Sequence, residues 1–338
     1  MSINKRKHDH LQVVLDEPAV DRNHHFFDEI NLTHRALPEL NFEEISTETD
    51  FLGKKLNMPF LIASMTGGKD KKFQIINRRL AEAAQEVGVA MGVGSQRIQI
   101  DSPEAEESFN LRKYASDIPL IANLGAVQLN DHRVTFDNIK HIISTLEADA
   151  LFLHLNPLQE VIQEKGDVNF KNLVDKIRRL NEQLSIPVII KEVGSGLSTA
   201  DIQLGIDADI KWFDLAGRGG TSWSRVEAVR NNLENDGILF QDWGIPTPYA
   251  LKQAQKFKNQ ANFIASGGLR NGLDLAKSLI LGAHLGSMAR PLLKTAMVSK
   301  EATIQHLEKI KRQLQTSMFL LGISRISELR HRKDLILP

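Results

Sequence analysis

Short apolar segments recur along this chain at a nearly constant interval, and this repeat is the feature that most limits how the chain can fold. The first four segments begin at residues 59, 89, 119 and 149, so each starts 30 residues after the one before it. That interval accommodates one buried strand and one crossover helix. Four further segments follow at 187–192, 210–216, 262–268 and 284–289. Eight such units predict an α/β fold, a (β/α)8 TIM barrel.

A doubly wound open sheet is the alternative architecture. In both folds the parallel strands are covered on two faces, so both predict strands that are apolar throughout, as these are. The count of eight strands favours the barrel. So does the lack of a Gly-x-Gly-x-x-Gly motif after the first strand, because that motif marks the dinucleotide-binding open sheets.

Two parts of the chain lie outside the repeat. We expect residues 1–50 to form an N-terminal extension, with a helix near 5–17 and short strands at 28–32 and 40–46. The barrel then occupies residues 51–338, and apolar spacing predicts a C-terminal helix over 303–321.

The connection after the sixth strand is long, running from Gly217 past Asp242 to a helix expected at 248–257. Three glycines and Trp223 at its root fit an active-site lid, and plain surface disorder of residues 222–242 fits as well.

The overall charge and the cysteine count exclude several classes of protein. Lys and Arg together number 42, as do Asp and Glu, so no whole-protein field favours nucleic acid or an anionic membrane. The chain has no cysteine, which excludes disulfides, thiolate metal sites and a cysteine nucleophile. It contains neither a run of 18 apolar residues nor a signal peptide, so we expect a cytoplasmic protein without a membrane span.

Barrel enzymes carry their chemistry at the carboxyl ends of the strands. Here those ends are rich in cationic and amide side chains and poor in free carboxylates. This suits an anionic ligand with a polar ring better than a sugar-cleaving carboxylate pair. The residues are Ser64, Thr66, Gly67, Gly68, Ser95, Gln96, Arg97, Asn123, His154, Asn156, Gln159, Glu160, Lys191, Glu192, Asp214, Gly217, Gly219, Thr221, Ser266, Gly267, Gly268, Arg270, Ala289 and Arg290.

The end of the seventh strand, Ser266-Gly-Gly-Leu-Arg270, has the composition of a phosphate-binding loop. Its glycines let backbone N–H groups approach an anion, and the following helix start adds a positive dipole. A tight turn alone has the same composition. The segment Gly286-Ser-Met-Ala-Arg290 after the eighth strand favours the phosphate, because barrels often hold phosphate between these two loops.

Other polar residues each allow a structural and a functional interpretation. Lys191, at the end of an apolar strand, fits an ion pair with Glu192 or another carboxylate, or a cation beside an anionic ring. His154 fits a buried core histidine or a site residue. Glu160 fits a surface carboxylate or a Mg²⁺ ligand that acts together with substrate phosphate oxygens.

The basic start of the chain also has two interpretations. Arg6, Lys7 and His10 fit a solvated tail, or together with Arg97 a diphosphate clamp.

Taken together, the motifs resemble one known family along nearly the whole chain: the type 2, FMN-dependent isopentenyl-diphosphate isomerases. The His-Leu-Asn-x-x-Gln-Glu block and the N-terminal Arg-Lys-x-x-His are the most specific, whereas the glycine loop is shared by many FMN barrels. The matching segments are Arg6–His10, Ser64–Gly68, Gly94–Arg97, Ala122–Gly125, His154–Glu160, Lys191–Gly194, Gly217–Trp223 and Ser266–Arg270.

The resemblance implies interconversion of isopentenyl diphosphate and dimethylallyl diphosphate, with reduced FMN, Mg²⁺, and NAD(P)H as reductant. It implies catalytic roles for Gln159, His154 and Lys191, and Glu160 as the metal ligand. The implied substrate residues are Arg6, Lys7, His10, Ser95, Gln96, Arg97, His154, Asn156 and Gln159. The implied FMN residues are Ala63, Ser64, Met65, Thr66, Ser95, Asn123, Lys191, Thr221, Gly267, Gly268, Arg270, Ala289 and Arg290.

The chemistry agrees with this interpretation. An unactivated alkene is a very weak base, no cysteine is present to act as an acid, and a neutral glutamine is a poor acid by itself. A reduced flavin would supply both the proton carrier and nearby electron density. Lys191 would tune the flavin ring, and Gln159 would orient the substrate or relay a proton.

Two other functions stay open. An FMN-dependent oxidoreductase shares the barrel and the phosphate loop, although the dehydrogenase form needs a cysteine, and the oxidase form a histidine base in another loop. A flavin-binding module without catalysis would leave Arg6, Lys7 and Arg97 unused. The resemblance also implies a homo-oligomer, a tetramer or octamer.

Overall fold

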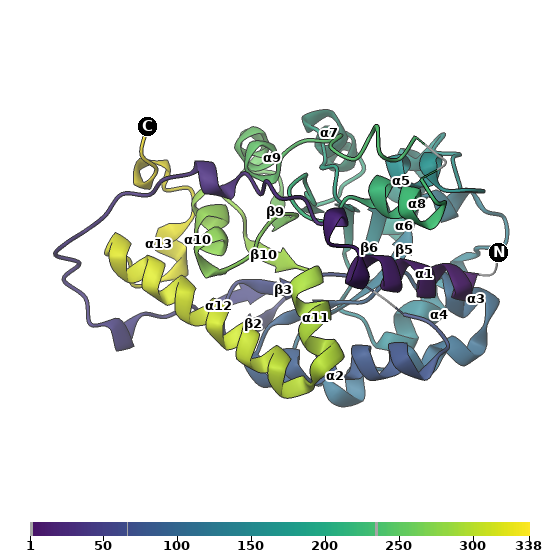
Figure 1. Cartoon of the computed structure of the whole chain (residues 1–338), viewed down its shortest axis with the longest axis horizontal. Coiled ribbons are helices and arrows are strands. Elements are labelled where there is room, and N and C mark those ends of the chain that lie inside the picture. The colour runs from purple at the N-terminus through teal and green to yellow at the C-terminus, as the bar shows by residue number, and fades with distance from the viewer. Residues whose placement is uncertain (1–2, 66, 234–235) are drawn as a thin grey trace.

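The barrel forms the centre of the molecule (Figure 1). In this computed structural model, residues 3–65, 67–233 and 236–338 are described. Eight parallel strands close in the order β10-β3-β4-β5-β6-β7-β8-β9. The apolar segments therefore predicted every barrel strand, and the (β/α)8 TIM barrel is confirmed. The strands are β3 Phe60–Ile62, β4 Ala90–Gly92, β5 Leu120–Gly125, β6 Ala150–Leu155, β7 Val188–Glu192, β8 Trp212–Asp214, β9 Asn262–Ser266 and β10 Leu285–Met288.

Helices surround this barrel, and the longer ones bury an apolar face. In α2, Phe73, Ile76, Leu80 and Ala84 recur at helical spacing and are buried, and Gly88 ends the helix at a φ of +76°. The described α-helices are α1 Ile3–Asp16, α2 Lys71–Val87, α3 Arg97–Asp101, α4 Phe136–Leu146, α5 Pro157–Ile162, α6 Leu173–Gln183, α7 Thr199–Asp207, α8 Trp223–Arg230, α9 Thr247–Ala254, α10 Gly272–Ile280, α11 Arg290–Val298, α12 Lys300–Leu321 and α13 Ile326–Leu329.

Several short 3-10 helices connect these elements. They are η1 Pro18–Val20, η2 Phe27–Glu29, η3 Phe42–Glu44, η4 Pro103–Ser108, η5 Arg112–Tyr114, η6 Ala126–Asn130, η7 Gln255–Phe257 and η8 Lys333–Leu335. None of the α-helices in the described part of the chain is long and apolar enough to cross a lipid bilayer.

A hairpin that the sequence reading missed closes the amino end of the barrel. Strands β1 Thr49–Phe51 and β2 Lys54–Leu56 pair through a tight turn, in which Leu52 and Gly53 have φ values of +51° and +75°. Phe51 and Leu56 are buried and join the apolar cluster inside the barrel. The Phe51 ring meets Trp212 edge-on at 4.9 Å between centroids. The hairpin thus plugs the end of the barrel opposite the strand carboxyl ends.

The predicted N-terminal helix is present as α1, but the two short strands predicted after it are wrong. Residues 28–32 and 40–46 contain the single turns η2 and η3, with only isolated bridges from Leu32 to Ile336 and from Ser46 to Arg325. In the second turn the Asn41 side chain accepts the Glu43 N–H, a local bond that competes with extended pairing.

The long connection after β8 has more structure than the sequence suggested. Ser222 caps α8, which packs against both α1 and α5. Residues 234 and 235, part of the expected lid or disordered stretch, lie outside the described residues. Beyond them, the carbonyl of Gln241 accepts hydrogen bonds from the Arg22 guanidinium at 2.6 Å and 3.0 Å. The expected C-terminal helix is confirmed as α12, which packs on α2, α10 and α11.

Candidate functional site

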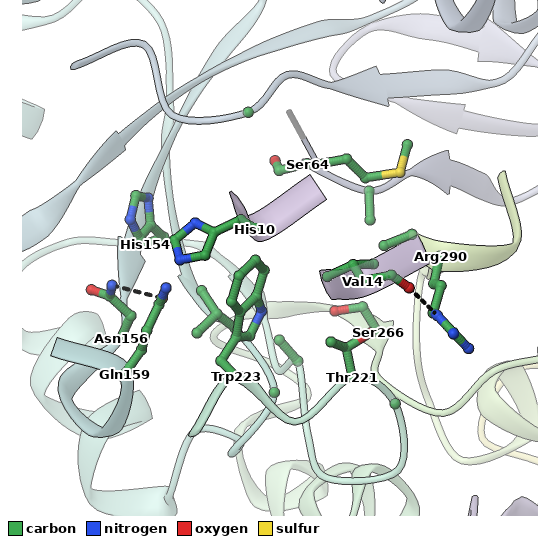
Figure 2. A pocket seen from close by; sticks show the side chains of 18 of the residues that line it. His10, Val14, Ser64, His154, Asn156, Gln159, Thr221, Trp223, Ser266 and Arg290 are labelled. Carbon is green, nitrogen blue, oxygen red and sulfur yellow. Dashed lines mark hydrogen bonds between the residues drawn. The ribbon is translucent and has the colours of Figure 1, made fainter. Parts of the chain in front are cut away.

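One pocket opens at the carboxyl ends of the barrel strands, and α1 forms part of its wall. Twenty of the residues for which the resemblance implies a catalytic, substrate, flavin or metal role line it. They are Arg6, Lys7, His10, Ala63, Ser64, Met65, Ser95, Arg97, Asn123, His154, Asn156, Gln159, Glu160, Lys191, Thr221, Gly267, Gly268, Arg270, Ala289 and Arg290. In Figure 2, His154, Asn156 and Gln159 lie at one end and Arg290 at the other, with His10 and Trp223 between them.

Two residues for which the resemblance implies such a role are not among the pocket residues. Thr66 lies outside the described residues. Gln96 is fully buried and points away from the pocket, because its Nε2 donates to Gln99 Oε1 at 2.7 Å and to the carbonyl of Ile142 at 2.9 Å. Its Oε1 accepts the Asn123 N–H at 3.0 Å. The geometry therefore contradicts a substrate contact by the Gln96 side chain and makes it a support of the β5 end.

Lys191 forms a buried ion pair with a different carboxylate from the neighbouring Glu192. Its Nζ donates to Asp214 Oδ2 at 2.9 Å, and Ser266 Oγ donates to Asp214 Oδ1 at 2.5 Å. Glu192 instead accepts four successive backbone N–H groups, which belong to Val193 and the residues up to Gly196. Lys191 thus lines the pocket as a cation, and Asp214 at the end of β8 already balances its charge.

His154 is held as a neutral imidazole. Asn123 Nδ2 donates to the Val93 carbonyl at 3.0 Å, which turns Asn123 Oδ1 toward His154 Nδ1 at 2.7 Å. An amide oxygen only accepts, so Nδ1 carries the proton and Nε2 keeps its lone pair. Burial, together with the charges of Lys191 and Lys7, lowers the pKa of His154 to about 4. Its free nitrogen is therefore an acceptor at neutral pH.

The turn after β6 places three polar side chains on α5. Pro157 starts this short helix, where its missing N–H costs nothing. Asn156 Nδ2 donates to Glu160 Oε1 at 2.9 Å and to Gln159 Oε1 at 3.1 Å. Glu160 Oε2 accepts the Asp167 N–H at 2.8 Å. Burial raises the pKa of Glu160, although these hydrogen bonds and nearby Arg6 favour its charged form.

The sequence reading missed Glu227, which ties together several of these residues. Glu227 on α8 is buried, and its Oε1 lies 3.0 Å from Gln159 Nε2 and 2.7 Å from His10 Nε2. Its other oxygen pairs with Arg230. Glu227 lies within the connection that the sequence suggests is a lid or a disordered segment. Ser222, a good N-cap residue, is the sequence signal for the helix that carries it.

Two of the cations nominated for a diphosphate, Lys7 and Arg97, are already hydrogen-bonded. Lys7 Nζ donates to the carbonyl of Ser95 at 2.8 Å. Burial and the neighbouring Arg6 lower the pKa of Lys7 to about 7. Arg97 pairs with Asp167 at 2.5 Å and lies 3.6 Å from Asp131. These contacts keep the basic groups at one end of the pocket.

The glycine loop after β9 has the backbone geometry of an anion cradle. Gly267 and Gly268 have φ values of +90° and +89°, and a Cβ at Gly267 would lie 2.0 Å from the carbonyl oxygen of Gly217. Arg270 and Arg290, from the loops after β9 and β10, both reach Asp21, which the sequence reading did not nominate.

Four buried side-chain atoms of the pocket residues have no partner within the described protein: Ser64 Oγ, Ser287 Oγ, Asn156 Oδ1 and Gln128 Oε1. Buried polar groups are normally hydrogen-bonded, so unpartnered ones facing a pocket indicate a polar ligand. No group of three or more His, Cys, Asp or Glu residues in the described chain could hold a metal ion alone.

Comparison with known proteins adds sequence relatives and structural neighbours. The family model for FMN-dependent dehydrogenases matches residues 7–108 and 128–335. The chain is 52% identical to an isopentenyl-diphosphate delta-isomerase of Hydrogenovibrio crunogenus, covering 99% of this chain and 98% of the relative. It is 48% identical to the enzyme of that name from Paracoccus zeaxanthinifaciens, covering 98% and 96%.

Solved structures show the same fold at low sequence identity. The flavin-binding domain of baker's yeast flavocytochrome b2 superposes with a TM-score of 0.69 at 18% identity, covering 93% of this chain and 77% of that one. A mandelate oxidase mutant gives 0.62 at 15% identity, covering 95% and 90%. At these identities the likeness concerns the barrel alone.

Proposed function

Because this chain belongs to the type 2, FMN-dependent isopentenyl-diphosphate delta-isomerases, we propose that it interconverts isopentenyl diphosphate and dimethylallyl diphosphate with reduced FMN and Mg²⁺. One observation carries the proposal: a single pocket has an anion-binding group at each end. Gly267, Gly268 and the two arginines form one, and Arg6 with Arg97 forms the other. A phosphate-bearing cofactor and a diphosphate substrate would fill these two ends.

The residues present fit a flavin mononucleotide. The glycine cradle and the arginine pair suit its phosphate, and the unpartnered oxygens of Ser64 and Ser287 suit its polar ring and chain. Lys191 would lie beside the ring and stabilise its anionic reduced form by charge. Bound in that form, FMN supplies acid–base chemistry at a ring nitrogen and electron density beside the alkene.

At the other end, Arg6, Lys7, His10, Ser95 and Arg97 would bind the diphosphate. Guanidinium groups suit phosphate oxygens because they donate two parallel hydrogen bonds. Glu160 would hold Mg²⁺ together with phosphate oxygens, since Mg²⁺ commonly takes one or two carboxylates and substrate phosphates. That arrangement agrees with the lack of a preformed metal cluster in the described residues.

At the same end of the pocket, opposite Arg290, His154, Asn156 and Gln159 would place the alkene. His154 is neutral, with its Nε2 lone pair available, so it would accept a hydrogen bond rather than donate a proton. Gln159 is anchored on Glu227 and would orient the substrate or relay a proton. Asn156 Oδ1 has no partner in the described protein and would accept from bound substrate or water.

Further parts of the proposal rest on family membership. NAD(P)H would reduce the flavin without net oxidation of the substrate. The N-terminal extension, residues 1–50, would contribute to the substrate site, and residues 51–338 would form the FMN-binding barrel. We also propose a cytoplasmic homo-oligomer, a tetramer or octamer.

An anaerobic assay tests the function. Isopentenyl diphosphate is incubated with the full chain, FMN, Mg²⁺ and NADPH, and each is omitted in turn. We expect dimethylallyl diphosphate only when all are present, with no oxidised product. Activity without FMN would contradict the proposal. A reduced product formed in proportion to the NADPH consumed would favour the oxidoreductase alternative.

A further inference from the structure

Asp21 contacts both arginines of the proposed cofactor phosphate site. Its Oδ1 accepts from Arg270 Nη2 at 2.6 Å, and its Oδ2 accepts from Arg290 Nη1 at 2.9 Å. Asp21 lies 249 and 269 positions away from these arginines in the sequence. The contact therefore joins the N-terminal segment to the loops after the last two strands.

The backbone around Asp21 fixes the position of this carboxylate. Asp21 forms an antiparallel bridge with Thr221, and the N–H of Ser222 donates to the carbonyl of Val20 at 2.7 Å. Thr221 itself lines the pocket. These contacts fix the backbone at Asp21, and the hydrogen bonds from the two arginines then hold its carboxylate between them.

The two guanidinium groups keep donors that Asp21 does not use. Arg290 Nε donates to the Val14 carbonyl at 2.9 Å, a bond drawn in Figure 2. Arg290 Nη2 and Arg270 Nε make no hydrogen bond with any residue that the structure describes. Each arginine can therefore bind an anion while it remains paired with Asp21.

We propose that Asp21 is a positioning residue for the flavin phosphate: it holds Arg270 and Arg290 together so that their remaining N–H groups face the glycine cradle. The inference rests on the proposed FMN cofactor. A carboxylate near a phosphate also repels it, but the alignment outweighs that repulsion. Without Asp21, the two largely buried guanidinium groups would repel each other and move apart, and FMN binding would have to bring them together again.

The test measures the affinity of the full-length protein for FMN and for riboflavin, which has the same ring but no phosphate. Loss of a charge-assisted contact predicts that Asp21→Asn weakens FMN binding roughly tenfold. Riboflavin affinity should stay unchanged. Asp21→Glu, which keeps the carboxylate, should recover most of the FMN affinity. Asp16→Asn, an exposed neighbour in α1, is the matched control and should bind both as the wild type does.

Each other outcome overturns the proposal. If Asp21→Asn binds FMN as tightly as the wild type does, Asp21 has no effect on the phosphate site. If it binds FMN more tightly, Asp21 competes with the phosphate for the arginines. Equal losses for FMN and riboflavin would make its role merely structural. Asp21→Ser serves as a second variant if the first fails to fold. Wild-type protein that binds neither flavin would instead refute the proposed cofactor, a result distinguishable from any difference between variants.

Discussion

The side-chain amide of Gln159 donates to Glu227 Oε1 at 3.0 Å, so a residue nominated for catalysis is anchored on α8. His10 from α1 meets the same oxygen at 2.7 Å. One buried carboxylate therefore sets the positions of two groups that come from different helices, α1 and α5.

Replacing Glu227 with Gln should lower kcat more than it raises KM. The neutral amide can still accept a hydrogen bond, but Arg230 loses the nearer of two carboxylates and Gln159 loses a charge-assisted contact. Misplacement near the reacting atoms can cost about 100-fold in rate. Steady-state kinetics on enzyme saturated with reduced FMN would measure kcat and KM separately. Glu301→Gln, at an exposed site on α12, is the control. Unchanged kcat in Glu227→Gln would show that this anchor does not matter.

Gln159→Ala should reduce isomerase activity with reduced FMN while leaving flavin affinity unchanged, since Gln159 lies at the substrate end of the pocket in Figure 2. Full activity in this variant would remove the proposed orienting or relay role. Flavin titration of the same preparation separates this loss from a damaged cofactor site.

Lys7 should make substrate binding sensitive to pH near neutrality. Burial places its pKa at about 7, so in the free enzyme the ammonium form, which binds diphosphate, is lost as pH rises above that value. We expect KM to rise by up to about tenfold per pH unit above pH 7. Lys7→Arg stays charged and should show a flatter profile. Equal slopes for wild type and Lys7→Arg between pH 7 and 9 would assign the dependence to another group.

His154 should not titrate between pH 5 and 8, because burial and nearby lysines place its pKa at about 4. The imidazole ¹⁵N shifts of the protein, assigned by comparison with His154→Gln, would test this. An unfolded histidine titrates near 6.5, so the unfolded chain binds more protons between pH 4 and 6.5. The contribution of His154 to the free energy of unfolding therefore falls as pH drops through that window. A midpoint near 6.5 in the folded protein would contradict the neutral assignment.

Removing one member of the Lys191–Asp214 pair should cost more than removing both. Lys191→Met leaves a carboxylate at a fully buried site and should lower the free energy of unfolding by about 3–5 kcal/mol. Lys191→Met combined with Asp214→Asn should recover most of that loss. Urea denaturation of the two variants without flavin measures the difference. If the double variant is less stable than the single one, the two charges do not compensate each other in this way.

Features fixed by local composition could be predicted from the sequence, and those fixed by distant contacts could not. The apolar segments located all the barrel strands, because a strand buried on both faces must be apolar regardless of its neighbours. The turns at 28–32 and 40–46 were mistaken for strands, since weak alternation was outweighed by local hydrogen bonds such as the one from Asn41. The hairpin containing Phe51 depends on the open end of a barrel, which no local pattern reveals.

The same distinction between local composition and distant contacts applies to the candidate site. Residues at strand ends, such as His154 and Lys191, were found because the fold brings all carboxyl ends together. Glu227 and Asp21 were missed because their importance lies in partners far along the chain. Gln96 was misjudged because adjacency to Arg97 says nothing about the direction of its side chain.

The contact between Asp21 and Arg290 also bears on when the pocket can exist during synthesis. Asp21 leaves the ribosome long before Arg290, which lies 269 positions later and directly follows the last barrel strand. A nascent chain that stops just before residue 290 would hold Asp21 and Arg270 but would lack Arg290. Retention of flavin would therefore mark chains made past the last barrel strand, and products truncated before residue 290 would emerge colourless.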